Sequence, residues 1–405
     1  MKESIWRNPL LLTVYVPTLV ISAGRRMLVS VLPFYADNFH ASYGSVGLLL
    51  ASESIGMIIG DVPAGILISK LGLRRAMIVG VGLVAAMVLA MSFARSLPEL
   101  ILYGLISGIG TALWNISRHA YLSNTVPVHQ RGRAIAIFGG VNRMGSFAGP
   151  AMGGLIGVTL GLRSVFWVYA ALAAIAMLFP ALFAGEADSA SVNRRGGLRG
   201  HSHHFWELLR TQSRIFLTAG SGQLMAQMIR AGRDFVLPLY GKDILGLDVQ
   251  ETSLILSMGS GIDMLLFLPA GMIMDRFGRK FAYVPSFTLQ AIGMALIPFT
   301  WNFATLVTAA MFIGFGNGLG SGTMMTLGAD LAPRDSMGEF LGLWRLIGDG
   351  GSSSGPIVIG SVAQLLGLIP AIFVIAGVGA SAAAILGLLV PETLKTKRLD
   401  AQPQG

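Results

Sequence analysis

The residues of this sequence best suited to chemistry are charged side chains inside long apolar runs. Seven arginines lie in such runs: Arg25, Arg26, Arg118, Arg143, Arg230, Arg233 and Arg345. Five carboxylates accompany them: Glu53, Asp61, Asp234, Asp263 and Asp349. A charge in the hydrocarbon core of a bilayer is costly unless it faces protein, water or an opposite charge. We therefore treat these residues as candidates for binding a solute or carrying a proton.

The composition decides which class of protein contains them. Of 405 residues, 53% are hydrophobic and 12% are charged, whereas soluble domains carry about 25% charged residues. Cysteine is absent, which excludes disulfides and thiolate chemistry. The sequence contains no nucleophile–base set, no metal-ligand set and no phosphate-binding G-x-x-x-x-G-K-S/T loop, so neither an enzyme nor direct use of ATP is expected.

Apolar runs of about 20 residues predict an all-α membrane protein with twelve transmembrane helices. We expect them near 9–35, 45–69, 76–95, 98–124, 132–159, 164–185, 215–240, 252–274, 281–301, 303–328, 340–366 and 369–390. A hydrophilic linker over 186–214 separates a six-helix bundle at 1–185 from a second one at 215–405. The third, sixth, ninth and twelfth helices carry no charge in their cores and are predicted to face lipid.

The distribution of basic residues predicts the orientation. Nineteen lysines and arginines lie at the termini and in the even-numbered loops, whereas the opposite side carries only Arg95, Arg163 and Lys242. The positive-inside rule then places both termini in the cytoplasm, for a multi-pass protein of a cytoplasmic (inner) membrane. The net charge of +9 reflects this topology and does not indicate nucleic-acid binding.

The two halves repeat each other at a constant separation of 206 residues. Pro63-Ala64-Gly65 recurs as Pro269-Ala270-Gly271, Gly149-Pro150 as Gly355-Pro356, and Pro127 as Pro333. Two related six-helix halves are the architecture of many secondary transporters, whose solute site lies near the middle of the membrane between the repeats. We expect the charged residues to line that site.

The excess of arginine over carboxylate favours a solute with an anionic or zwitterionic group, because guanidinium binds carboxylate and phosphate in a bidentate manner. Arg25, Arg26, Arg118 and Arg143 are the first candidates for contact with the substrate, and Asn142, Arg230, Arg233, Asn317 and Arg345 complete the predicted binding set. The alternative is structural. Arg230 with Asp234, and Arg345 with Asp349, are four residues apart and can neutralise each other on one helix face.

Three carboxylates have no such partner on their own helix: Glu53, Asp61 and Asp263. Burial favours the protonated form of a carboxyl group, so these residues are candidate proton carriers, with Asp234 and Asp349 as further ones. The alternative is that they pair across helices with the arginines.

Two further sets of residues carry a family resemblance. The loop after the eighth predicted helix contains G-x-x-x-D-R-x-G-R-K as Gly271, Asp275, Arg276, Gly278, Arg279 and Lys280. The fifth helix contains G-x-x-x-G-P-x-x-G-G as Gly145, Gly149, Pro150, Gly153 and Gly154. With these motifs, nearly the whole chain resembles the major facilitator superfamily, most nearly its twelve-span drug/proton antiporters. The resemblance implies gating roles for the motif residues and export by proton exchange.

The sequence departs from this pattern at two places. After the second helix the loop motif keeps Gly65, Lys70, Gly72 and Arg74, but Ser69 stands where the family has an acid. In the fourth helix Gly104 occupies the position of the antiporters' arginine. The family's gating role for the first loop, and its usual proton-relay arginine, are therefore not assigned to this sequence.

The sequence thus predicts a secondary transporter that works by alternating access, with proton-coupled efflux of a small amphipathic compound as the first hypothesis. The alternative is an organic-anion symporter, uniporter or exchanger without proton coupling. Its expected partners are the solute, protons and membrane lipid, and we expect a monomer without metal or cofactor, driven by the proton gradient. His201, His203 and His204 in the linker are interpreted as solvated residues and not as a metal site.

Overall fold

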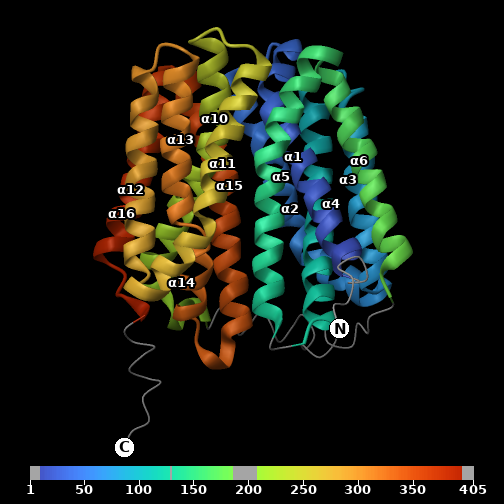
Figure 1. Cartoon of the computed structure of the whole chain (residues 1–405), viewed down its shortest axis with the longest axis vertical. Coiled ribbons are helices and arrows are strands. Elements are labelled where there is room, and N and C mark those ends of the chain that lie inside the picture. The colour runs from blue at the N-terminus through green and yellow to red at the C-terminus, as the bar shows by residue number, and fades with distance from the viewer. Residues whose placement is uncertain (1–9, 128–129, 186–207, 395–405) are drawn as a thin grey trace, which may run out of the picture. The chain divides into compact units, whose positions relative to one another are not determined.

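The computed structural model describes residues 10–127, 130–185 and 208–394, and these residues fold as helices joined by short connections (Figure 1). In the first half, a π-helical turn at Leu11–Tyr15 leads into α1 (Val16–Ala36). The helices that follow are α2 (Tyr43–Leu71), α3 (Leu73–Met91), α4 (Leu97–Thr125), α5 (Arg131–Leu160) and α6 (Leu162–Phe183).

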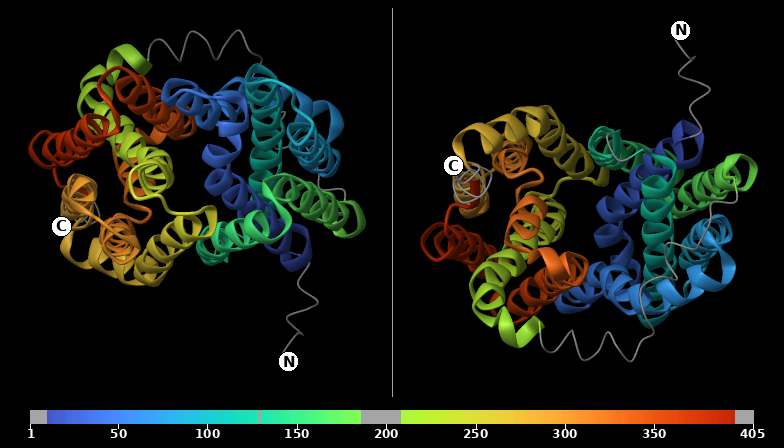
Figure 2. Two further views of the ribbon diagram at one scale, coloured as in Figure 1. Left: turned by 90° about the horizontal axis from the view of Figure 1, so that it is seen from above. Right: turned by 90° about the horizontal axis from the view of Figure 1, so that it is seen from below.

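The second half has the same order of long helices with one interruption. A short α9 (Ser213–Ile215) and a π-helical turn precede α10 (Ser221–Asp243). The helices that follow are α11 (Val249–Phe277), α12 (Lys280–Leu296), α13 (Phe303–Leu319), α14 (Thr323–Leu331), α15 (Met337–Leu366) and α16 (Leu368–Leu388). The helix axes within each unit run in roughly one direction, so most helices are seen nearly end-on in Figure 2.

The described residues form two compact units. The first contains α1 to α6 together with residues 241–257, and the second contains α9, α10 up to Tyr240, and the chain from Met258 onward. Most of the predicted linker lies outside the described residues, so the expected boundaries at 185 and 215 stay a prediction.

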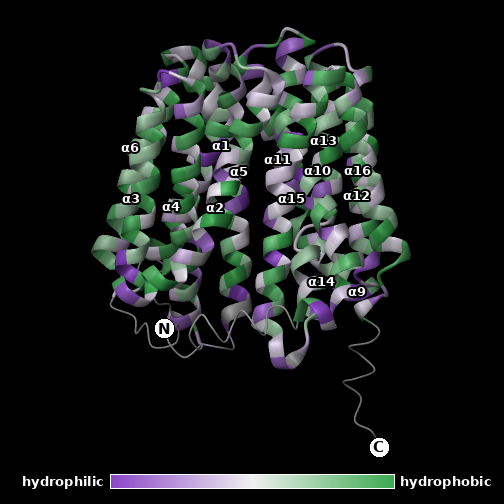
Figure 3. Cartoon of the chain, turned by 180° about the vertical axis from the view of Figure 1, so that it is seen from behind, coloured by the Kyte–Doolittle hydropathy of each residue, from purple (hydrophilic) through white to green (hydrophobic). Residues whose placement is uncertain are grey.

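Nine helical segments in the described residues are long and apolar enough to cross a membrane. Helices α3, α6, α12 and α16, predicted to carry no charge in their cores, are among them, and Figure 3 shows them as predominantly hydrophobic. Large apolar side chains are exposed on them, among them Leu182 and Leu388 at 72% and 83%. Three helices of similar length, α5, α10 and α15, fall outside this group and contain intramembrane arginines. The all-helical membrane fold is confirmed, and the count of twelve spans stays a prediction.

Glycine backbones set the helix crossings at equivalent places in both units. A Cβ atom added to Gly108 of α4 would collide with the carbonyl oxygen of Glu53 in α2. A Cβ atom added to Gly314 of α13 would collide with the carbonyl oxygen of Gly259 in α11. The two glycines are 206 residues apart, and so are their partners. The repeat seen in the sequence is therefore a repeat of close helix contacts, which small residues permit in membrane proteins.

The tenth predicted helix, expected to be continuous over 303–328, is broken in the structure. The chain leaves the helical path between α13 and α14, where Gly322 adopts a left-handed conformation with φ of 75°. The guanidinium of Arg230 donates to the carbonyl oxygen of Gly320 (3.2 Å), and the hydroxyl of Thr323 donates to the same oxygen (2.7 Å). Side-chain donors at this carbonyl therefore stabilise the break, while the equivalent helix α4 runs without interruption over Leu97–Thr125.

Replacing Gly314 with alanine tests the helix crossing. We expect Gly314→Ala to lower stability by about 1–3 kcal/mol, because the new methyl group forces two backbones apart. The thermal unfolding midpoint of the detergent-solubilised protein measures the effect.

Gly342→Ala is the matched control, because nothing lies within 4 Å of the place that its new methyl group would take in α15. It should be neutral, or stabilising by up to about 1 kcal/mol through its higher helix propensity. Equal midpoints for the two variants would contradict the packing role of Gly314.

Candidate functional site

An ion pair joins α1 to α2 within the first unit. The Nε of Arg25 donates to Oε2 of Glu53 at 2.9 Å, and the hydroxyl of Thr111 in α4 donates to Oε1 at 3.3 Å. The arginine and glutamate side chains are 38% and 21% exposed. Glu53 thus pairs across helices with an arginine, as the structural alternative expected.

The second unit has a carboxylate with a different partner at an almost equivalent place. The amide Nδ2 of Asn317 in α13 donates to Oδ2 of Asp263 in α11 at 2.9 Å. Asn317 lies 206 residues after Thr111, and Asp263 lies one helical turn beyond the counterpart of Glu53. The repeat therefore places a carboxylate and a hydrogen-bond donor on the same pair of helices in each unit.

The amide of Asn317 can serve Asp263 in two protonation states. Its NH2 group already binds the carboxylate, while its Oδ1 is buried and has no hydrogen-bond partner among the described residues. An amide offers both donors and acceptors, so Oδ1 can accept a hydrogen bond from a carboxylic acid. The amide therefore binds Asp263 through its donor and keeps a buried acceptor in addition.

Arg118 is the most enclosed of the first-half arginines predicted to bind substrate. It is 5% exposed and donates to the hydroxyl of Thr18 (3.1 Å) and to Oδ1 of Asn115 (2.8 Å). Its guanidinium also lies over the rings of Trp114 and Phe138, at 5.1 and 4.4 Å from their centroids. These contacts hold it between helices, which favours the structural role for this residue.

The remaining first-half candidates lie on α1, α2 and α5. Arg143 is half-buried, with its Nη1 3.5 Å from the carbonyl oxygen of Gly139, and Asn142 beside it is exposed. Arg26 is half-buried on α1, and Asp61 on α2 has one buried carboxylate oxygen. Their roles in binding stay predictions.

The second-half arginines divide into buried and accessible ones. Arg230 binds Gly320 and stacks over Phe287 at 5.3 Å, and Arg233 is 8% exposed with Asp234 at 3.5 Å. Arg345 and Asp349 are 3.4 Å apart on one face of α15, as their spacing predicts, and the arginine side chain is 37% exposed. Asp234, which the spacing pairs with Arg230, contacts the neighbouring Arg233.

The glycine–proline motif of α5 packs on α1. Cβ atoms added to Gly145, Gly149 or Gly153 would meet the α1 backbone or Ser22. Beside Pro150, the hydroxyl of Ser257 donates to the carbonyl of Phe147 (2.7 Å) and accepts from the N–H of Ala151 (2.9 Å). Those two groups are partners in a regular helix, and a side chain inserted between such partners is a recognised cause of bending. Gly154 contacts Ser253, so residues 253 and 257 both meet this motif.

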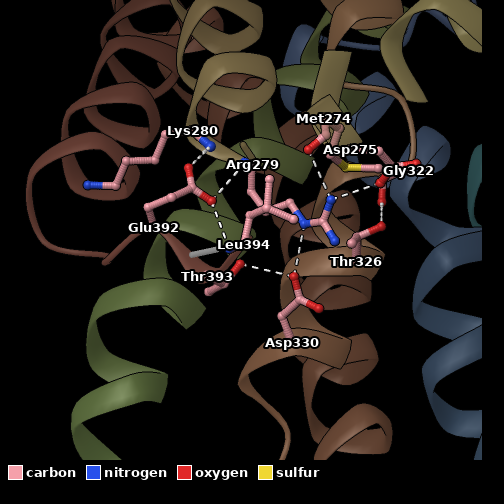
Figure 4. Close-up of polar contacts among 10 residues, drawn as sticks. All are labelled: Met274, Asp275, Arg279, Lys280, Gly322, Thr326, Asp330, Glu392, Thr393 and Leu394. Atoms are coloured by element: carbon pink, nitrogen blue, oxygen red, sulfur yellow. Dashed lines mark hydrogen bonds and ion pairs between the residues drawn. The ribbon is translucent and has the colours of Figure 1, made fainter. Parts of the chain in front are cut away.

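The complete loop motif between α11 and α12 forms a closed network of charges (Figure 4). Arg279 is 7% exposed at its side chain and contacts Asp275 and Asp330, each at 2.9 Å. Glu392, which follows α16, accepts the backbone N–H groups of Arg279 and Lys280 at 2.9 Å. Gly278 has φ of 121°, and a Cβ there would meet the Glu392 carboxylate. The network joins four segments of the second unit.

The loop between α2 and α3 carries the incomplete copy of this motif and lacks the network. Ser69 replaces the acid and turns its hydroxyl back to the Ile66 carbonyl (2.8 Å), and Leu73 stands where the second copy has Arg279. Gly72 retains its positive φ of 80°, and Lys70 is exposed. Arg74 instead donates to the carbonyl of Ala181. Both the acid and its basic partner are therefore missing from the first half.

Several residues that contribute to these contacts carried no prediction, among them Thr111, Ser257, Asp330 and Glu392. Of these four, only Thr111 had a usable signal, because the 206-residue repeat aligns it with Asn317. Within the described residues, no group of histidine, aspartate and glutamate side chains is arranged to hold a metal ion. The three linker histidines lie outside those residues.

The sequence matches the Major Facilitator Superfamily over residues 15–265 and again over 219–404. The chain belongs to this superfamily. Its members are transporters and not enzymes.

Relatives and solved structures of the superfamily agree with this assignment. An uncharacterized MFS-type transporter of Methanocaldococcus jannaschii is 20% identical, over 88% of this chain and 91% of the relative. Multidrug resistance protein 2 of Bacillus subtilis is 21% identical over 69% and 70% of the two chains. The tetracenomycin C resistance and export protein of Streptomyces glaucescens is 26% identical over 40% of this chain and 30% of its own.

Two solved structures have the same fold. A peptide transporter of the POT family in complex with sulfate superimposes with a TM-score of 0.79 at 13% identity, covering 97% of both chains. A bacterial homolog of the human lysosomal transporter Spinster gives 0.78 at 16% identity and full coverage of both chains. The major facilitator fold is confirmed over nearly the whole chain.

The Glu392 network predicts a pH dependence of stability. Partial burial raises the pKa of Glu392, but three backbone hydrogen bonds and the charge of Arg279 outweigh it and hold the pKa below its ordinary value of 4.5. A carboxyl group whose pKa is lowered on folding stabilises the fold above its ordinary pKa, and this contribution is lost as the pH falls through the lowered value.

We expect Glu392→Gln to lower the thermal midpoint at neutral pH, and the difference from wild type to shrink as the pH is lowered below about 4.5. Glu339→Gln, at the start of α15, is the control. A midpoint difference that stays constant from pH 7 to pH 3 would show that Glu392 does not act through its charge.

Proposed function

We propose that this transporter exports a small amphipathic compound with an anionic or zwitterionic group, in exchange for protons, by alternating access. Asp263 is the proposed proton carrier. The cytoplasmic (inner) membrane is the proposed location, with both termini in the cytoplasm, because the basic loops follow the positive-inside pattern.

The contact between Asp263 and Asn317 is the observation that carries this proposal. The carboxylate lies inside a segment long and apolar enough to span a membrane, where ionisable residues mark ion and proton pathways. Its amide partner provides a bound donor and a vacant buried acceptor, so the site can hold the carboxylate and the carboxylic acid in turn. Such a group can gain and lose a proton in each transport cycle.

Accessible arginines support an anionic or zwitterionic solute. The side chains of Arg25 and Arg345 are 38% and 37% exposed, and each contacts a carboxylate through its Nε. A guanidinium has five N–H donors in a planar fork, so it can keep its protein partner and still bind a solute carboxylate. Arg118 and Arg233 are buried, and we assign them structural roles and not contact with the solute.

The direction of transport is proposed from relatives and from the motif in α5. The Streptomyces protein is named for tetracenomycin C resistance and export, and the Bacillus protein for multidrug resistance. The glycine–proline motif resembles that of drug/proton antiporters. One antiporter feature is absent, because Gly104 occupies the position of the antiporters' arginine and a Cβ atom there would meet the hydroxyl of Ser52. The proton pathway proposed here therefore uses Asp263 and not an arginine in α4.

Proton flux into liposomes tests the proposal. Purified protein is reconstituted with a pH-sensitive dye inside, a proton gradient is imposed, and anionic, zwitterionic and cationic compounds are added in turn. We expect an anionic or zwitterionic compound to trigger proton flux in the wild type. Asp263→Asn should reduce that flux at least about tenfold while solute binding, followed by thermal shift, remains.

Asp335→Asn is the matched control, because this carboxylate is exposed in the short turn before α15. It should transport like the wild type. Undiminished proton flux in Asp263→Asn would overturn the role of this residue, and flux with lipophilic cations alone would overturn the proposed solute class.

The second candidate is an organic-anion carrier without proton coupling. The Arg25–Glu53 pair favours it, because the first-unit carboxylate is engaged in an ion pair 2.9 Å long between two helices. In that case the same liposomes should take up or exchange the anion at a rate that does not depend on the imposed pH gradient.

A further inference from the structure

A groove runs between α12 and α16 on the apolar side of the second unit. Its volume is about 770 Å³, within the ~300–1,000 Å³ of small-molecule sites. Small residues of α16 form one wall, among them Ala380, Ala384 and Gly387, and Pro285 of α12 lies opposite. Phe281 and Leu388 also line it and are 66% and 83% exposed. In a membrane-spanning protein, such an apolar surface faces lipid.

Only one residue of the groove carries a charge, and it lies at one end. Lys280 begins α12, and its ammonium donates to the carbonyl oxygen of Gly387 at 2.7 Å. Glu392 does not neutralise it directly, because that carboxylate binds the backbone N–H groups of Arg279, Lys280 and Leu394. In Figure 4 the side chain of Lys280 extends away from the Glu392 carboxylate. An ammonium has three donors, so two remain for a ligand.

The length of the groove matches one leaflet of a bilayer. Its lining on α12 extends from Lys280 to Ile292, which is about 18 Å at a rise of 1.5 Å per residue. Half of a hydrocarbon core of about 30 Å is about 15 Å. The groove therefore begins at the basic end of the helix pair and ends near the middle of the membrane.

We propose that this groove binds one acyl chain of an anionic phospholipid, whose phosphate accepts hydrogen bonds from the Lys280 ammonium. The charge at one end selects the headgroup, and the apolar walls take the chain. The lipid would lie against the start of α12, where the backbone N–H groups of Arg279 and Lys280 bind Glu392. It would therefore stabilise the loop network from the membrane side. This site lies apart from Asp263 and does not depend on the proposed function.

Lipid retention by the full chain in mild detergent tests the proposal by native mass spectrometry. Phosphatidylglycerol and phosphatidylcholine with identical acyl chains are the probes. A lysine near an anionic lipid surface contributes about 1 kcal/mol, which corresponds to about a fivefold preference for phosphatidylglycerol. We expect Lys280→Gln to abolish this preference and Lys280→Arg to keep it. Ala384→Leu should reduce retention of both lipids by filling the groove.

Arg276→Gln is the matched control, because Arg276 is an exposed cation of the same loop that does not line the groove. It should keep the wild-type preference. An equal phosphatidylglycerol preference in wild type and Lys280→Gln would overturn the proposal. A two-chain species that Ala384→Leu dissociates would also overturn it, because the groove would then bind a second copy of the chain.

Discussion

The cost of placing a charge among apolar helices constrains the rest of this structure. Each intramembrane charge needs a partner inside the protein, because lipid supplies no hydrogen bonds. Glu53 has Arg25 and Thr111, Asp263 has Asn317, and Arg230 has a backbone carbonyl at a helix break. These polar contacts join helices that would otherwise be held by van der Waals packing alone.

The two halves share a backbone scaffold and differ in their chemistry. Gly108 and Gly314 bring α4 onto α2 and α13 onto α11 at equivalent positions. The polar residues that distinguish the units lie at the crossing, as Glu53 does, or one helical turn from it, as Thr111, Asp263 and Asn317 do. In the first unit the carboxylate pairs with a permanent cation, and in the second it is held by a neutral amide. The guanidinium carries a permanent charge, whereas the amide is neutral and has a buried acceptor, Oδ1 of Asn317, without a hydrogen-bond partner among the described residues.

A second difference between the halves lies at the end that carries the basic loops. The loop between α11 and α12 has a complete set of charges, with Asp275, Arg279 and Asp330 joined directly and Glu392 bound to the backbone. Its counterpart has Ser69 and Leu73 in place of the first two. The second half also has the broken helix, and the nine-residue α14 is held by Arg279 at Asp330 and by Trp344 at the Met324 carbonyl. The more elaborate network and the less regular helix therefore belong to the same unit.

The sequence by itself determined the membrane helices, the repeat, the family motifs and the pairing of Arg345 with Asp349. These features depend on hydropathy over about 20 residues or on fixed spacing along the chain. Tertiary structure decided which partner each buried carboxylate has, because Glu53 and Arg25 are 28 residues apart and Asp263 and Asn317 are 54 apart. It also decided the helix break at Gly320–Gly322, because glycine pairs such as Gly153 and Gly154 remain helical elsewhere. Glycine permits such a break, but donors from distant residues such as Arg230 have to reach the released carbonyl, and only the packed helices bring them there.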